Sequence, residues 1–206
     1  GQASELVQLF DELQLETFYL VSHDRGSVIS DHLGAIDGMN QRITGYVRMQ
    51  QSGNKPHSEP RPPHEILHSA LGVELIRSGQ VHEMGYSTTG DNPLVVFPVD
   101  EKDLARLAME CARPGVAEGM SASFVSAGFD KELDDRMNGL FEAMTMPVLF
   151  LQGALDPGQQ PSEYETVTGE AADGYLQFIE AGRFLHLEKP EAVSAAIREF
   201  LVNSGR

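Results

Sequence analysis

The first part of the chain alternates between helical and strand-like apolar patterns. Apolar residues at helical spacing over residues 5–13 predict an amphipathic helix, with Ser4 as its N-cap. A short apolar run over residues 18–21 ends at small and polar residues, and a second helical pattern follows, with Asp31 on its solvated side and its end near Gly38. Residues 42–49 then read as another strand. A helix between two strands is the parallel crossover unit, so this part predicts a parallel sheet.

The middle of the chain has a different pattern. Residues 51–63 are polar and rich in proline, which is typical of an exposed crossing, and helical patterns follow at residues 67–76, 103–111 and 117–129. Strand character returns at residues 147–151 and 175–179, with a helix near 162–167 between them and a last helix opened by Pro190. We therefore expect an α/β core in two parts, residues 1–50 and 144–206, and a helical cap or lid over residues 51–143.

The turn between the first strand and the second helix carries the first candidate chemistry. Asp24 is its apex, and Ser22 and Gly26 supply the small side chains that a very sharp turn needs on either side. A carboxylate held there projects above the carboxyl end of the sheet, beside the positive end of a helix, and can act as a nucleophile. The alternative is an ordinary helix-capping aspartate.

The composition narrows the possible partners. Against 15 basic residues stand 31 acidic ones, and the net charge of −16 argues against nucleic acid or an anionic membrane as a partner. Cys111 is the only cysteine, so no internal disulfide can form, and neither a long apolar span nor a signal peptide is recognisable. We expect a cytoplasmic protein whose partner is a small-molecule substrate.

Three histidines in the crossing segment raise the question of a metal. His57, His64 and His68 lie close together in sequence, but no cysteine or carboxylate completes a ligand set on the same helix face. We therefore predict no metal site and no cofactor.

Four segments in order resemble the α/β-hydrolase fold, in the branch of epoxide hydrolases and haloalkane dehalogenases with an aspartate nucleophile. They are the turn S-H-D-R-G at residues 22–26, the helical lid, the acid loop L-Q-G-A-L-D-P at 151–157 and the tail A-G-R-F-L-H-L-E-K-P-E at 181–191. The resemblance covers nearly the whole chain. It implies that Asp24 forms an alkyl ester, and that Asp156 orients the group that activates the hydrolytic water.

The tail departs from the pattern of this branch. Arg183 stands where the family has its general base, a histidine, and an arginine does not give up its proton at any relevant pH. His186 lies three residues further on and is the substitute base to consider. Arg183 itself could pair with either carboxylate or hold an anionic ligand.

Other positions bear on the substrate. The family's epoxide hydrolases protonate the opening ring with lid tyrosines; Tyr86 is the only tyrosine in the insert, and Phe124 stands at the usual place of another. Arg25 stands where the dehalogenases have a halide-binding tryptophan, and His23 adjoins the nucleophile. We expect His23, Arg25 and Phe124 to contact the substrate.

The resemblance also places further strands before the first helix, and these are absent here. The chain is then the C-terminal part of the fold, and the strand at residues 17–21 has an unpaired edge, which a second copy or another chain could cover. Three functions follow: an epoxide-hydrolase-like enzyme whose hydrolytic step lacks its base, a dehalogenase, or a catalytically silent relative that binds a small ligand or partner.

Overall fold

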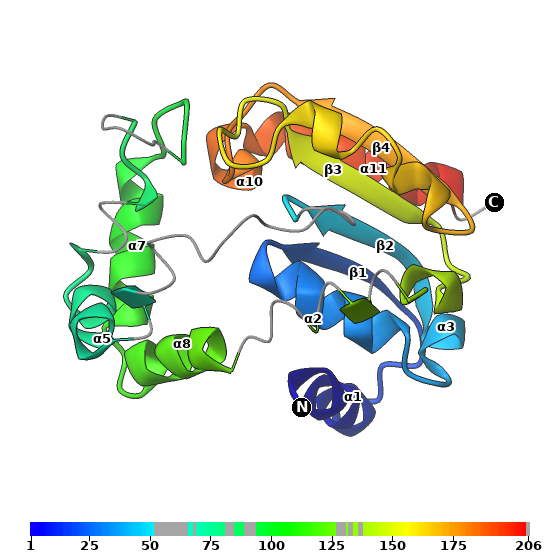
Figure 1. The fold of residues 1–206 in the computed structure, drawn as a ribbon, viewed down its shortest axis with the longest axis horizontal. Helices are drawn as coiled ribbons and strands as arrows, with labels where there is room; N and C mark the ends of the chain where they lie inside the picture. Colours follow the sequence, from blue (N-terminus) through cyan, green and yellow to red (C-terminus); the bar gives the residue numbers. More distant parts are fainter. Residues whose placement is uncertain are drawn as a thin grey trace.

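The computed structural model describes residues 1–51, 66–67, 69–80, 85–88, 94–126, 131, 134–135 and 138–204. Four strands form one parallel sheet in the order of the chain, namely β1 (Phe18–His23), β2 (Ile43–Met49), β3 (Val148–Gly153) and β4 (Gly174–Ile179) (Figure 1). The predicted parallel sheet is therefore confirmed, and the carboxyl ends of its strands lie at one edge.

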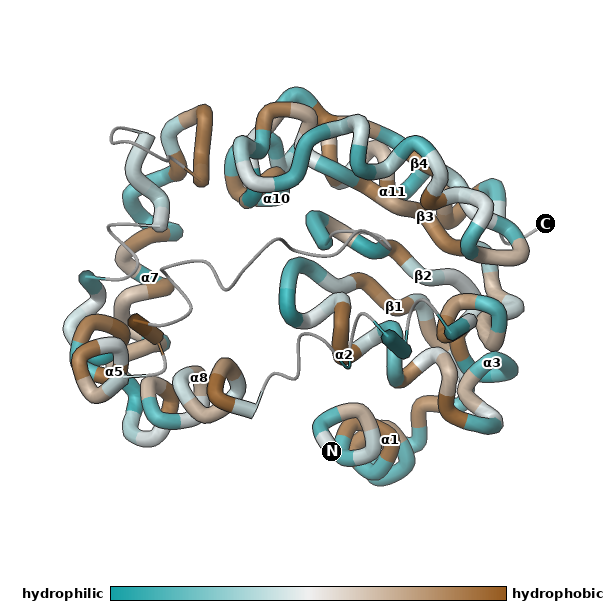
Figure 2. Tube along the Cα trace, viewed as in Figure 1, coloured by the Kyte–Doolittle hydropathy of each residue, from teal (hydrophilic) through white to brown (hydrophobic). Residues whose placement is uncertain are grey.

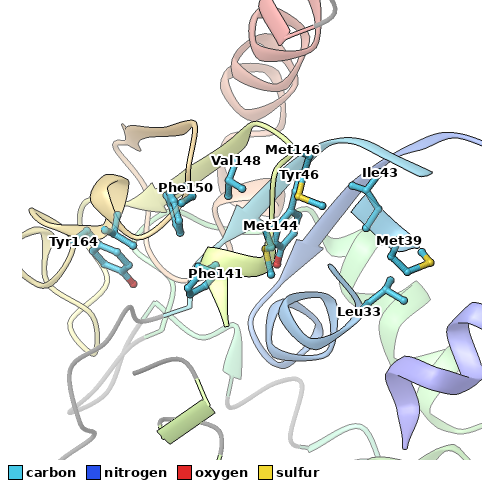
Figure 3. Packing of buried hydrophobic residues seen from close by; sticks show 12 residues of the cluster. Leu33, Met39, Ile43, Tyr46, Phe141, Met144, Met146, Val148, Phe150 and Tyr164 are labelled. Carbon is cyan, nitrogen blue, oxygen red and sulfur yellow. The ribbon is translucent and has the colours of Figure 1, made fainter. Parts of the chain in front are cut away.

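Both faces of the sheet are apolar, because successive side chains of a strand point to opposite faces. Tyr46, Val148 and Phe150 face the helices α1 (Gln2–Glu12), α2 (Arg25–Gly34) and α3 (Met39–Arg42) in the larger core, drawn in Figure 3. Val47 and Leu149 face the opposite way, against α11 (Pro190–Ser204). Helices thus cover both faces, and Figure 2 shows brown, hydrophobic stretches on the strands β1 and β3 between them.

The first helix differs in detail from its prediction. Helix α1 begins at Gln2, and the amides of Ser4 and Glu5 donate to the Gly1 carbonyl at 2.9 and 3.2 Å, so the prediction of Ser4 as N-cap is wrong. The backbone carbonyl of Gly1 accepts the Ser4 amide, which a side-chain cap would otherwise have bonded.

Helix α2 is shorter than predicted and its polar face is different. It ends at Gly34, before Gly38, and α3 follows. Asp31 was expected on the solvated side and is instead fully buried. It follows the buried Val28 by three residues, so it shares the inward face of the helix, where Arg48 from β2 pairs with it. An apolar pattern alone could not show this partner.

The insert has a small core of its own. Helices α5 (Ala70–Arg77), α7 (Glu101–Cys111) and α8 (Val116–Val125) pack around the buried residues Ile76, Cys111 and Ala117. In Figure 1 these helices lie beyond the carboxyl ends of β1 and β2. They are therefore on the side of the sheet where the candidate chemistry was predicted.

The segment between β3 and β4 is not the predicted helix near residues 162–167. Two short 3-10 turns stand there, η2 (Pro161–Glu163) and η3 (Val167–Gly169), and another, η1 (Phe141–Ala143), precedes β3. Tyr164 and Val167 are both buried, and their spacing of three is the period of a 3-10 turn. No helix of the described residues is long and apolar enough to cross a membrane.

Candidate active site at the carboxyl edge of the sheet

Asp24 lies at the apex of a strained turn between β1 and α2. Its φ of 48° and ψ of −123° are unusual for a residue with a side chain, and such strain persists only where the surrounding structure holds it. The Asp24 amide donates to the Met49 carbonyl at 3.0 Å, and the Ser27 amide donates to the Asp24 carbonyl at 2.9 Å. This is the sharp turn that the sequence predicts at this position.

Gly26 has open space beyond its own turn. Among the described residues outside its neighbours and the α2 backbone, a Cβ added to Gly26 would meet no atom within 4 Å. The close approach in this region is at Gly153 instead, where an added Cβ would lie 2.0 Å from the carbonyl oxygen of Gly182.

Asp156 lies in the loop after β3 and is fully buried. One of its oxygens accepts a hydrogen bond from the Gly158 amide at 2.7 Å, and the other accepts one from the Gln50 side chain, also at 2.7 Å. Gln50 follows β2 directly with a φ of 45°, and its Oε1 accepts from the Gly153 amide at 2.6 Å. Gln50 was missed by the sequence reasoning, and its one signal was a polar residue at the carboxyl end of a buried strand.

Arg183 joins the two carboxylates. Its Nη1 donates to Asp24 Oδ2 at 2.8 Å, and its Nη2 lies 3.1 Å from Asp156 Oδ2. The Arg183 side chain is 10% exposed, whereas that of Asp24 is 32% exposed. A single guanidinium thus lies between the candidate nucleophile and the candidate acid, in the place predicted for it from the tail motif.

The backbone of Arg183 is fixed as well. Its amide donates to the Leu94 carbonyl at 2.8 Å, and its carbonyl accepts a hydrogen bond of 2.8 Å from Nε2 of His23. Nearby, Glu188 of the short helix α10 (Leu185–Glu188) accepts from the amides of Val96 and Phe97 at 2.7 and 3.0 Å. Hydrogen bonds therefore join the tail, residues 183–188, to residues 94–97 of the insert. The sequence did not predict this role of Glu188.

The charges at the site act in opposite directions. Burial by itself would raise the pKa of Asp24, but Arg183 and then His23 lower it below its usual range. The pKa of Arg183 is raised by Asp24 and Asp156 in spite of burial. Burial lowers the pKa of His23, although Asp24 opposes this. At neutral pH the site therefore holds an ionised Asp24 paired with a charged Arg183, beside a neutral His23 imidazole.

His186 is in a different environment from the one a general base needs. It lies on α10 with its ring 4.6 Å from that of His23, and among the described residues its buried Nδ1 has no hydrogen-bond partner. Burial, with a smaller effect of His23, lowers the pKa of His186 to about 4. In the described part of the chain, neither a hydrogen bond nor an ion pair joins it to Asp24 or Asp156.

The remaining predicted site residues are only partly brought together. Tyr86 stacks against Phe184 with ring centroids 4.4 Å apart, and burial, with smaller effects of Cys111 and Asp24, raises its pKa to about 12. Arg25 opens α2 and lines a cavity of about 550 Å³ between α1, α2 and the end of α8, a cavity whose lining does not include Asp24. Phe124 lies half-buried on α8.

Metal binding finds no support in the described residues, which contain no group of three His, Cys, Asp or Glu side chains able to hold an ion. His57, His64 and His68 lie outside the residues that the structure describes.

No family model matches the chain, and no curated protein is significantly similar to it in sequence. Solved structures do resemble it. A thermophilic esterase from Thermogutta terrifontis is 20% identical over 98% of this chain and 71% of its own, with a TM-score of 0.69. Haloalkane dehalogenase DbeA from Bradyrhizobium elkani USDA94 is 18% identical over 98% and 73%, with a TM-score of 0.73.

A third solved structure also resembles the chain. MGS-M2, an α/β hydrolase enzyme from a Medee basin deep-sea metagenome library, is 15% identical over 97% of this chain and 70% of its own, with a TM-score of 0.66. At such low identity the likeness concerns the fold. The chain has an α/β-hydrolase fold, with a parallel sheet flanked by helices and a helical insertion, and the solved structures that resemble it include an esterase and a haloalkane dehalogenase.

Proposed function

We propose that this hydrolase-like protein uses Asp24 to attack an electrophilic carbon of a small apolar substrate, an epoxide or an alkyl halide. The observation behind this proposal is the position of Asp24 at a strained strand-to-helix turn, with a guanidinium that keeps its carboxyl group ionised. A carboxylate is a nucleophile only in its ionised form. Asp24 also remains partly exposed, so a substrate has access to it.

The attack forms a carbon–oxygen ester bond while the epoxide carbon–oxygen bond or the carbon–halogen bond breaks. A halide leaves as an ion and needs no proton. An opening epoxide leaves an alkoxide, which takes a proton from an acid. We assign this role to Tyr86, because burial keeps its hydroxyl protonated at neutral pH and the field of Asp24 acts on it. His23 and Phe184, next to Tyr86 and Arg183, extend this wall of the substrate site in the proposal.

The second half-reaction lacks its base. Hydrolysis of the ester needs a group that takes a proton from water near neutral pH, and Arg183 holds its proton far above that range. His186, with a pKa of about 4, has little affinity for a proton at neutral pH, and it is bonded to neither carboxylate in the described residues. The proposal therefore predicts that the ester on Asp24 accumulates.

A second candidate function is a catalytically silent protein that binds a small ligand. The observation that favours it is the same ion pair: Arg183 donates directly to Oδ2 of Asp24, and a carboxylate engaged in an ion pair is a weaker nucleophile. In this case the insert and the sheet edge would bind a ligand without any bond being made.

Intact-mass measurements after incubation with a panel of epoxides and alkyl halides distinguish these functions. We expect one stable adduct per chain, absent from Asp24→Asn, without continued product formation; halide release would identify a dehalogenase. Arg183→His should convert the adduct into turnover, because an imidazole then lies near Asp156. Arg198→His, on the exposed side of α11, is the matched control and should leave the adduct stable. Ligand binding without adduct would favour the silent protein.

A further inference from the structure

A completely buried ion pair lies beside the turn that carries Asp24. Arg48 of β2 donates from Nε to Asp31 Oδ1 at 3.0 Å and from Nη2 to Oδ2 at 2.9 Å, and the two side chains are 0% and 1% exposed. The third nitrogen of the guanidinium donates to the Gln51 carbonyl at 2.7 Å. The charges are therefore paired in a bidentate geometry, away from solvent.

Tyr46 connects this pair to the turn. Its hydroxyl donates to Asp31 Oδ1 at 2.9 Å, and the same oxygen lies 3.1 Å from the Ser27 carbonyl oxygen and 3.1 Å from Ser22 Oγ. Ser22 and Ser27 flank Asp24 on β1 and α2. Figure 3 shows Tyr46 among the residues of the larger core.

The two serines close the connection around the turn. Ser22 Oγ donates to Ser27 Oγ at 3.2 Å, and Ser27 Oγ donates to the Met49 carbonyl at 3.2 Å. The same carbonyl accepts the amide of Asp24 at 3.0 Å. One continuous polar network thus links β1, β2 and the first two turns of α2, which are the three elements that meet at Asp24.

Stability alone gives a weak reason for such a network. A buried ion pair repays at best most of its desolvation cost, and well-packed apolar residues of the same volume are often as stabilising. The strained backbone of Asp24, in contrast, costs about 1–3 kcal/mol and needs surroundings that leave no other conformation. A buried hydrogen-bond network that joins all three elements restricts their movement and can impose one.

We infer that Asp31, Arg48 and Tyr46, acting through Ser22 and Ser27, are positioning residues that hold Asp24 in its strained conformation for attack. The inference rests on the proposed function for the attack itself, and on the geometry of the network for the positioning. None of the three touches a substrate, so their effect is on the rate of bond formation and not on substrate binding.

Tyr46→Phe tests this inference, because it removes only the hydroxyl that joins the ion pair to the turn. Styrene oxide at increasing concentration gives a limiting rate of Asp24 alkylation and a half-saturating concentration. We expect the limiting rate to fall about tenfold, with the half-saturating concentration unchanged, as for a lost buried hydrogen bond. Amide hydrogen exchange in the segment around Asp24 should become faster by more than the change in global stability explains.

Two serines provide a variant and its matched control. Ser27→Ala removes a buried hydroxyl of the network, and its effects should resemble those of Tyr46→Phe. Ser121→Ala removes another buried serine hydroxyl, which donates to the Leu67 carbonyl in the insert at 2.8 Å, and it should change neither the limiting rate nor exchange around Asp24. If Tyr46→Phe does not fold, the limiting rate and the amide exchange of Ser27→Ala test the inference.

The outcomes separate the two proposals. Exchange around Asp24 that is unchanged in both network variants overturns the positioning role. Faster exchange with no alkylation of the unmodified protein supports the positioning role and contradicts the proposed function. Faster exchange with an unchanged alkylation rate overturns the link between the strained conformation and the attack.

Discussion

The carboxyl group of Asp24 is subject to two opposing influences. Burial would raise its pKa, and the stronger combined effect of Arg183 and His23 lowers it. Attack requires the ionised form, so the alkylation rate should stay constant from neutral pH down to about pH 4 and decline only below it, where an ordinary aspartate is already half protonated. A pH–rate profile of adduct formation measures this.

Arg183→Gln is the comparison for that profile. Without the guanidinium, burial determines the pKa of Asp24, and the decline should move to higher pH. The ion pair also affects stability. In the unmodified protein, the lowered pKa of Asp24 stabilises the fold above the pKa of the unfolded chain, and this stabilisation is lost as pH falls through the pKa of the folded protein. Superimposable profiles would show that Arg183 does not control the ionisation of Asp24.

His186 predicts a different response to acid. Its pKa of about 4 lies below the unfolded value, so the unfolded chain takes up its proton first as pH falls. The free energy of unfolding should therefore decrease between about pH 6.5 and pH 4. His186→Phe removes this group, and its loss of stability from about pH 7 to pH 5 should be smaller in urea titrations.

His32→Phe is a suitable control for that experiment. His32 lies on α2, away from the His23 ring, and its Nε2 is 3.9 Å from Asp135 Oδ2. Equal acid sensitivity of the His186→Phe variant and the unmodified protein would mean that other groups account for the response. At the residue scale, Asp24 and Asp156 were proposed from turns that follow predicted strands, and Arg183 was proposed from the resemblance of the tail motif. Gln50 and Glu188 were not predicted, since the atoms they bond become neighbours only in the folded chain.

At the scale of elements, the end of β3 is the most crowded place near the site. A Cβ on Gly153 would lie 2.0 and 2.7 Å from the carbonyl oxygens of Gly182 and Ala181. These are backbone atoms, which cannot rotate away, so Gly153→Ala should lower the free energy of unfolding by about 3 kcal/mol or more. Urea denaturation measures the change.

Gly119→Ala should raise the free energy of unfolding instead of lowering it. Gly119 lies in α8, where a Cβ meets no atom within 4 Å among the described residues. Because alanine is a better helix former than glycine, this variant should be about 0.5–1 kcal/mol more stable, provided the insert unfolds with the core. Equal stability of the Gly153→Ala variant and the unmodified protein would show that the tail loop moves aside freely.

Elements with a strong period were predictable, and elements that depend on distant partners were not. The strands and α11 follow from apolar runs and from the spacing of Val193, Ile197 and Leu201. Asp31 is buried with its partner Arg48, and the 3-10 turn that ends at Tyr164 places this ring in the larger core. No local pattern contains either fact.

At the scale of the whole molecule, β1 is at the edge of the sheet. Among the described residues no strand pairs with its outer side, and Tyr19 and Val21 are 40% and 45% exposed. An open apolar edge invites association, so the average mass in solution should rise with protein concentration. Val21→Lys places a charge on this edge and should reduce the rise, as measured by size exclusion with light scattering.

Val202→Lys is the matched control, because Val202 is equally apolar and 61% exposed but lies on α11. It should associate like the unmodified protein. A monomer at all concentrations would contradict the role of β1. The parallel sheet was predictable from the apolar patterns of the sequence, whereas contacts at its outer edge depend on atoms far away in the sequence or on another chain.

The ion pair between Asp24 and Arg183 joins residues 159 positions apart, so its two partners are synthesised at different times. On the ribosome, both carboxylates emerge well before the guanidinium that neutralises them. Until then Asp24 and Asp156 repel each other, and the entropy of closing so long a loop opposes their approach. The bridge between the two carboxylates can form only when translation has passed Arg183, so an interrupted chain would leave Asp24 and Asp156 without the guanidinium that joins them.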